Sequence, residues 1–362
     1  MRAAEVSGQI ITISDAKRAD DHAAHTQVWL SLFRRPPPPK RATDGQHEGQ
    51  VRLGQKLFAD PALSGAGTMS CATCHDPQRQ FTDGRTHQVA RAASGTPRPR
   101  QTLSLWGVGD AARLNWDGRH TRLEAQARGP IESALEMNAS WPVVLDRLNA
   151  QPAYRALFAR SRDDAVRATV LPGPQVAQGA VGPNRQANVL PGPQVAQSAV
   201  GPNRQAGDAM DSAGAATTQG VLNALAAYQR TLAPPVTRFD AWARGQQSAL
   251  SAQEQRGFAL FVGKARCALC HRTWRFTDDG LHDIGLPLEH AEPQRQFKTP
   301  TLRAIAHTAP YMHDGRFAGL ARVVEHYNDG AIERPTLSPN LQARLNLSPA
   351  EIAALTAFLR TL

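Results

Sequence analysis

Cys71-Ala72-Thr73-Cys74-His75 and Cys267-Ala268-Leu269-Cys270-His271 are the two stretches of sequence that decide the fold. Together they use all four cysteines of the chain. In a C-x-x-C-H motif the two thiols can form thioether bonds to one porphyrin, and the histidine that follows can ligate its iron. We therefore expect two covalently bound haem c groups. The expected attachment residues are Cys71, Cys74, Cys267 and Cys270, and the expected iron ligands are His75 and His271.

A structural zinc site is the competing interpretation, because cysteine and histidine are also zinc ligands. Zinc coordination gives no reason for a histidine directly after each pair of cysteines, whereas haem attachment does. The pattern therefore favours haem.

The size and charge of the chain limit the classes of function. Its 362 residues are enough for two domains, and its formal net charge is +10. The propionates of two haems would make the holoprotein less basic, and a remaining basic surface would suit an acidic redox partner. The sequence contains no nucleic-acid-binding motif and no apolar segment long enough to cross a bilayer. We expect neither nucleic acid binding nor a membrane span.

The haem motifs also predict the compartment. Covalent haem c is normally attached outside the cytoplasm, so we expect a periplasmic protein. Residues 1–30 contain no apolar core of a signal peptide. We therefore expect that the start site is misassigned or that an upstream leader is missing from this sequence.

The chain divides into four expected segments. Residues 1–47 form a mobile lead-in, residues 48–165 the first, peroxidatic haem domain, and residues 216–362 the second, electron-transfer domain. Between them, residues 166–215 contain Val170–Asn188 and a second copy of it with two substitutions. Because this stretch is rich in proline and glycine and lacks apolar periodicity, we expect a disordered insertion.

Three helices are recognisable from their patterns. An amphipathic helix starts at Glu48 and leads towards the first haem motif. Ser251 with Glu254 and Ser348 with Glu351 form the serine–glutamate pattern of a capping box, which begins a helix.

A weak, long repeat relates the two halves. Trp116-Asp117-Gly118-Arg119 follows His75 at nearly the same distance as His313-Asp314-Gly315-Arg316 follows His271. We therefore expect an all-α fold of two c-type cytochrome domains, related by a pseudo-twofold axis and with long loops.

The repeat also predicts that the two irons differ. Pro130 and Tyr327 occupy equivalent positions, each seven residues after a leucine. Proline has no ligating group, so the first iron is expected to be five-coordinate and open, whereas the phenol of Tyr327 can be the sixth ligand of the second iron. Met312 and His313 are rival ligands, because either side chain can bind iron.

The motifs from Leu53 to Leu362 resemble the bacterial di-haem cytochrome c peroxidase family, and particularly its MauG-like branch. The stretches that carry this resemblance are Leu53-Gly54, the two C-x-x-C-H motifs, Phe81-Thr-Asp-Gly84, Trp116-Asp-Gly-Arg119, Lys298-Thr-Pro-Thr-Leu-Arg303 and Thr308-Ala-Pro-Tyr-Met-His-Asp-Gly315.

The resemblance implies roles for four residues around the first haem. Trp116 matches the tryptophan that carries charge between the haems. Gln126, Pro130 and Glu136 match the distal pocket, with Glu136 as the acid and base. The alternatives are a core-packing role for Trp116 and a solvated helix position for Glu136.

The resemblance also implies a possible calcium ion between the haems, held by the carbonyl groups of Thr308 and Pro310. The family's calcium-binding asparagine corresponds to Gln101, which is a departure from the pattern. A second departure is the absence of a histidine near Ala93, since the nearest is His87. We therefore expect the first haem to be open without prior reduction.

These features predict a peroxidase that reduces hydrogen peroxide with electrons from a small cytochrome c or cupredoxin. In the MauG-like alternative, peroxide oxidises a tryptophan or tyrosine of a partner protein. However, Gly263-Lys-Ala-Arg266, before the second haem motif, has no tryptophan for the surface relay used in methylamine dehydrogenase maturation. A non-enzymatic di-haem electron carrier is the third interpretation.

Overall fold

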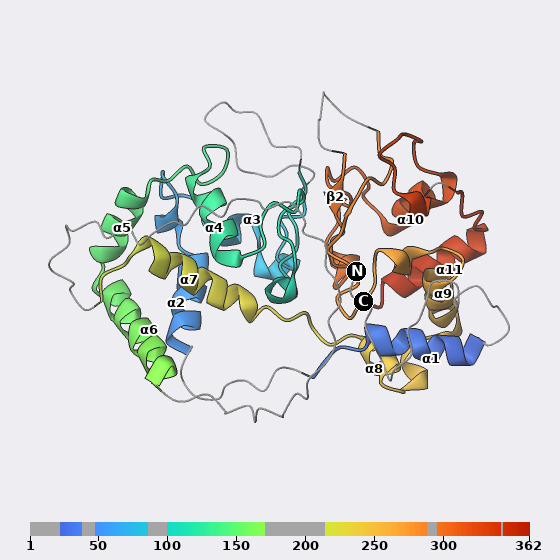
Figure 1. The fold of residues 1–362 in the computed structure, drawn as a ribbon, viewed down its shortest axis with the longest axis horizontal. Helices are drawn as coiled ribbons and strands as arrows, with labels where there is room; N and C mark the ends of the chain where they lie inside the picture. The colour runs from blue at the N-terminus through green and yellow to red at the C-terminus, as the bar shows by residue number, and fades with distance from the viewer. Residues whose placement is uncertain (1–21, 38–47, 86–99, 171–213, 288–294, 342) are drawn as a thin grey trace, which may run out of the picture.

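The chain folds into two mainly helical halves that lie side by side (Figure 1). The computed structural model describes residues 22–37, 48–85, 100–170, 214–287, 295–341 and 343–362. Within these residues, the regular β-structure is one short antiparallel pair, β1 (Leu281–His282) with β2 (Phe297–Lys298). The predicted all-α fold with two cytochrome c-type domains is confirmed.

The N-terminal haem domain is built around α2 (Glu48–Phe58), which packs against α7 (Thr218–Arg230). The helices approach closely at Gly54, where a Cβ atom would lie 1.9 Å from the carbonyl oxygen of Ala224. The remaining α-helices of this domain are α3 (Cys71–Cys74), α4 (Leu123–Glu132), α5 (Trp141–Asn149) and α6 (Pro152–Val170).

The C-terminal haem domain repeats this packing with α9 (Ala252–Val262) and α11 (Pro349–Leu359). A Cβ atom at Gly257 would lie 2.1 Å from the carbonyl oxygen of Ala354. Both helices begin at the serine–glutamate capping boxes expected from the sequence. The other α-helices described in this domain are α1 (His22–Phe33), α8 (Arg238–Ala243) and α10 (Leu320–Asp329).

The predicted boundary between insertion and second domain is wrong. Helix α7 belongs to the first domain, because Val221, Leu222 and Leu225 are buried in its core. It is the counterpart of α11, so the first domain is completed only when the chain returns to it. Helix α6 also extends to Val170, beyond the predicted domain end, and residues 171–213 of the predicted insertion lie outside the described part.

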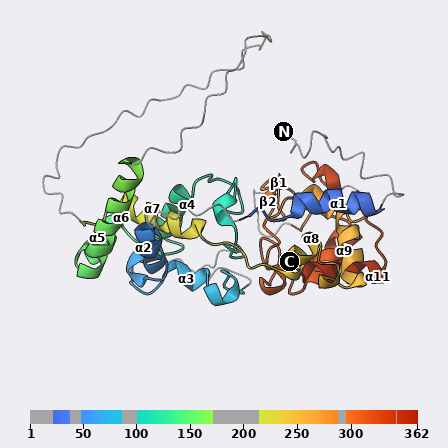
Figure 2. The ribbon, with the colours of Figure 1, turned by 90° about the horizontal axis from the view of Figure 1, so that it is seen from below.

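The prediction of a mobile lead-in over residues 1–47 is wrong for α1. This helix lies beside α8 and α9 in both ribbon views (Figures 1 and 2). Phe33 at its end is fully buried and stacks on Phe276 with ring centroids 4.7 Å apart. Leu30 joins the same core. Residues 1–21 and 38–47 lie outside the described residues.

The weak repeat corresponds to a shared backbone structure. A β-bridge joins Leu114 to His120 in the first domain and Tyr311 to Phe317 in the second. Inside each loop an aspartate carboxylate accepts the backbone N–H two residues later, at 3.2 Å in both copies. Each loop leads into a ten-residue helix, α4 or α10. Pro130 and Tyr327 are therefore at equivalent places in the fold.

Across the described ranges, we find no helix with the length and apolar character needed to cross a membrane.

Candidate haem sites

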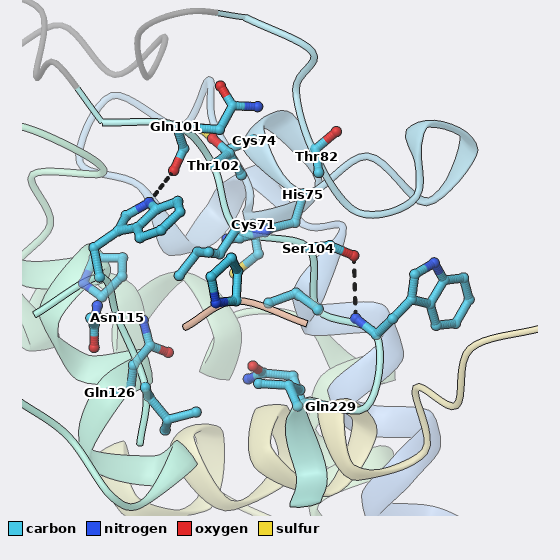
Figure 3. A pocket seen from close by; sticks show the side chains of 18 of the residues that line it. Cys71, Cys74, His75, Thr82, Gln101, Thr102, Ser104, Asn115, Gln126 and Gln229 are labelled. Carbon is cyan, nitrogen blue, oxygen red and sulfur yellow. Dashed lines mark hydrogen bonds between the residues drawn. The ribbon is translucent and has the colours of Figure 1, made fainter. Parts of the chain in front are cut away.

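The first haem motif lines a cavity of about 240 Å³ in the N-terminal domain. Cys71, Cys74 and His75 border the cavity on one side, and Gln126 of α4 and Gln229 of α7 enter from another (Figure 3). Much of the remaining wall is apolar, including Phe58, Leu105 and Met137.

Both proximal histidines are held by a backbone carbonyl group. His75 Nδ1 lies 3.1 Å from the Phe81 oxygen, and His271 Nδ1 lies 2.9 Å from the Phe276 oxygen. A carbonyl group can only accept, so Nδ1 carries the proton and Nε2 keeps its lone pair for a metal. Burial lowers the pKa of both imidazoles, which favours the neutral form that ligates iron.

The second haem motif lines a cavity of about 170 Å³ in the C-terminal domain. Cys267, Cys270 and His271 form part of its wall, and Tyr327 enters from α10. Burial raises the pKa of the Tyr327 phenol above its usual value. Each cavity thus combines two thiols, one histidine whose Nδ1 is held by a backbone carbonyl group, and apolar walls, a set that fits covalent haem.

Met312 and His313, the rival ligands, also line the second cavity. The His313 ring stacks on Phe297 at a centroid distance of 3.8 Å, and the backbone of Met312 has a positive φ of 73°. All three candidate ligands are therefore at the same cavity.

Trp116 lines both cavities. Its indole N–H donates to the Gln101 carbonyl oxygen at 2.7 Å, and its own carbonyl oxygen accepts the Lys298 N–H at 2.7 Å. The indole also makes an edge contact with His313, its counterpart in the repeat. A side chain fixed between two cavities is suitably placed to conduct charge between them.

The three residues expected above the first haem line the first cavity together. Gln126 and Pro130 are four residues apart on α4 and therefore share a helix face. Glu136 lies in the turn that follows, where its N–H donates to the Ser133 carbonyl oxygen at 2.9 Å.

The residues expected to bind calcium, Gln101, Thr308 and Pro310, also line this cavity. Gln101 is only 5% exposed. Within the described structure, neither the oxygen nor the nitrogen of its side-chain amide has a hydrogen-bond partner. A buried amide without partners is costly, so a ligand at this position would stabilise the fold. His87 and Ala93 lie outside the described residues.

The zinc alternative does not fit the geometry, because the two cysteine pairs lie in different domains. In the described part of the chain, Cys270, Asp278 and His282 are the one group of three or more such side chains close enough to share an ion. Haem attachment would consume the Cys270 thiol.

Sequence reasoning missed two features of the first cavity. Gln229 was overlooked because its helix, α7, was assigned to the other domain. The ion cluster of Arg275, Asp279 and Lys298 was also overlooked, although Arg275 and Lys298 from the C-terminal domain line the first cavity. Lys298 is the first residue of the motif that ends at Arg303. The position of this motif in the sequence does not indicate that Lys298 lines a cavity of the other domain.

Two family models match the chain. Residues 48–171 match the model described as di-haem cytochrome c peroxidase, and residues 254–362 match the model described as cytochrome c.

Relatives match this chain over nearly its whole length. The methylamine utilization protein MauG of Methylorubrum extorquens is 37% identical, over 98% of this chain and 89% of the relative. The cytochrome-c peroxidase IdrP1 of Denitromonas iodatirespirans is 29% identical, over 90% of this chain and 85% of the relative. Among solved structures, a MauG-like protein associated with microbial copper homeostasis matches with a TM-score of 0.68 and 26% identity, over 91% of this chain and 93% of the other.

Proposed function

Because the chain belongs to the di-haem cytochrome c peroxidase family, we propose that it is a periplasmic peroxidase with two unequal haem sites. Cys71 and Cys74 would hold the haem at which hydrogen peroxide reacts, and Cys267 and Cys270 the haem through which electrons arrive. The observation that carries this proposal is the difference between Pro130 and Tyr327 at equivalent places on α4 and α10.

The proton chemistry of peroxide cleavage is assigned to Glu136. When bound, the first haem supplies an iron that can accept peroxide and release electrons to it. The Glu136 carboxylate takes the proton from one peroxide oxygen and returns it to the other, so that water is the leaving group. The Gln126 amide, on the same cavity wall, orients the peroxide by hydrogen bonding.

The electron route is assigned to Trp116, which lines both cavities. Reducing one peroxide requires two electrons and two protons, and a small cytochrome c or cupredoxin delivers the electrons one at a time. The hydrogen bond from the indole to the Gln101 carbonyl oxygen keeps the ring in place between the sites.

Tyr327→Phe should change the low-spin haem and leave the high-spin haem unaltered. EPR of the resting ferric protein should show one high-spin signal, from the open iron, and one low-spin signal, from the iron that Tyr327 ligates. Tyr311→Phe is the matched control: Tyr311 lines the same cavity, but its hydroxyl already donates to the Ile305 carbonyl oxygen at 2.9 Å.

Two low-spin signals in the resting protein would contradict the open first site. If the low-spin signal were unaltered in Tyr327→Phe, the sixth ligand of the second iron would have to be Met312 or His313. If the reduced protein also failed to bind carbon monoxide, a plain electron carrier would be the better interpretation.

A second candidate function is the peroxide-dependent oxidation of a tryptophan or tyrosine on a partner protein. It is favoured by the tyrosine at the second cavity and by the 37% identity with a methylamine utilization protein. The stretch Gly263–Arg266, at the end of α9, has no tryptophan to relay charge to a docked partner. The partner would therefore have to use a different entry point.

We also propose a calcium ion held by Gln101, Thr308 and Pro310. Metal analysis of the holoprotein should find one calcium per chain, and Gln101→Leu should lower this content because it removes the side-chain oxygen. Gln229→Leu is the control: Gln229 lines the same cavity and loses the same side-chain amide, but it is not among the proposed ligands and its amide already donates to the Leu225 carbonyl oxygen. Holoprotein without calcium after purification in calcium-containing buffer would contradict this site.

A further inference from the structure

A buried cluster of charges joins the two domains beside the first cavity. The Asp279 carboxylate accepts hydrogen bonds from Arg275 Nη1 at 2.7 Å and from Lys298 Nζ at 3.3 Å. Arg275 and Lys298 are each 7% exposed. The two cations share one carboxylate, since the neighbouring Asp278 interacts with His282 at 3.0 Å.

This cluster holds a loop of the N-terminal domain. Arg275 Nη1 donates to the Asp110 carbonyl oxygen at 2.9 Å, and Asp279 accepts the Ala112 N–H at 2.9 Å. These contacts fix the residues around the 3₁₀ helix Val108–Asp110, part of the wall of the first cavity. The C-terminal domain therefore completes the binding site of the other domain.

The first cavity has an excess of positive charge. Within the described residues, its lining includes four cations and one carboxylate, which are Arg113, Arg119, Arg275, Lys298 and Glu136. Arg119 already contacts Asp117 at 2.7 Å. By contrast, Arg275 Nε is buried and has no hydrogen-bond partner in the described structure. A buried guanidinium with a free N–H next to a shared carboxylate favours an additional anion.

We propose that Arg275 and Lys298 bind the propionate carboxylates of the haem attached at Cys71 and Cys74, and thereby raise its reduction potential. Propionates are the anions that a haem brings into this cavity. Ferric haem carries one more positive charge than ferrous haem, so a buried cation nearby destabilises the ferric form. Lys298 lines both cavities, whereas Arg275 lines only the first, so their effects on the two haems differ.

The test is an EPR-monitored redox titration of the holoprotein, which needs no peroxide and therefore does not depend on the proposed enzymatic activity. The haem whose signal changes in Tyr327→Phe is assigned to the C-terminal domain. In Arg275→Gln, the ferric-to-ferrous ratio of the first haem at a fixed potential should rise about tenfold, which corresponds to about 59 mV for a one-electron couple. The reduction potential of the second haem should be unchanged.

Charge and structural roles are separated by further variants. Arg275→Lys weakens the two-point contact with Asp279 but keeps the positive charge. The reduction potential of the first haem should therefore stay close to the wild-type value. Arg238→Gln removes an equal charge from an exposed pair with Glu254, and should have no measurable effect because exposed charges are screened. Lys298→Met should lower the reduction potential of both haems. This variant provides the test if Arg275→Gln does not take up haem.

Resonance Raman spectra provide a second readout, because the propionate bending band responds to hydrogen bonding. This band should shift for the first haem in Arg275→Gln. The proposal is overturned if Arg275→Gln and Lys298→Met both leave the first potential unchanged. It is also overturned if Arg275→Lys and Arg275→Gln shift the potential equally, because the cluster would then be purely structural.

Discussion

Replacing Glu136 by glutamine should slow peroxide-dependent oxidation about 100-fold, the range for a lost general acid–base group. Glutamine has nearly the same size and can still form hydrogen bonds, but it cannot take a proton from one peroxide oxygen and give it to the other. Because Glu136 lines the first cavity, the loss should affect the reaction with peroxide itself. Stopped-flow spectra of the holoprotein mixed with hydrogen peroxide measure this step directly.

Glu132→Gln is the matched control for this variant. Glu132 lies at the end of α4, is well exposed and pairs with Arg128 at 2.9 Å, but does not line the cavity. The Glu132→Gln variant should react with peroxide at the wild-type rate. If Glu136→Gln also reacted at that rate, another group would have to move the proton, and the assignment of Glu136 would fail.

Phe33→Ala should lower the free energy of unfolding by about 3–5 kcal/mol, the usual cost of removing a buried phenylalanine. The ring is fully buried among five aromatic neighbours, which are Trp29, Phe239, Phe258, Phe261 and Phe276. Truncation leaves a cavity because these rings are held on helices and a loop that are themselves packed, so the rings cannot all close in. Denaturant unfolding of the holoprotein, followed by far-UV circular dichroism, measures the loss.

Val28→Ala on the same helix is the control for this prediction. Val28 is 39% exposed, and its truncation should change the free energy of unfolding by less than about 0.5 kcal/mol. If Phe33→Ala were equally mild, α1 would not be part of the domain core, and the lead-in interpretation would be correct after all.

Local patterns predicted those parts of the molecule that depend on neighbours in the sequence. The capping boxes at Ser251 and Ser348 begin helices because their hydrogen bonds span only three residues. The two haem motifs are local in the same sense. The spacing of the long repeat was also informative, because both copies preserve the same loop and helix.

The errors concern contacts that are distant in sequence. Nothing near Phe33 indicates that it packs against a ring more than two hundred positions away. Helix α7 has an apolar face that either domain could have buried, and its burial in the first core together with the close approach at Gly54 assigns it to the first domain. Nothing near Arg275 and Asp279 in the sequence indicates their partners, because Asp110, which accepts from Arg275, and Ala112, which donates to Asp279, belong to the other domain.

The shared loops have a consequence for how the two sites diverged in evolution. Their shape is maintained by the β-bridge and by the aspartate that accepts a backbone N–H, at Asp117 and Asp314. The residue before each aspartate has no part in these bonds, so an ancestral pair could become Trp116 in one copy and His313 in the other without loss of the loop. New reactivity was thus accessible through a substitution that leaves the bonds of the loop itself intact.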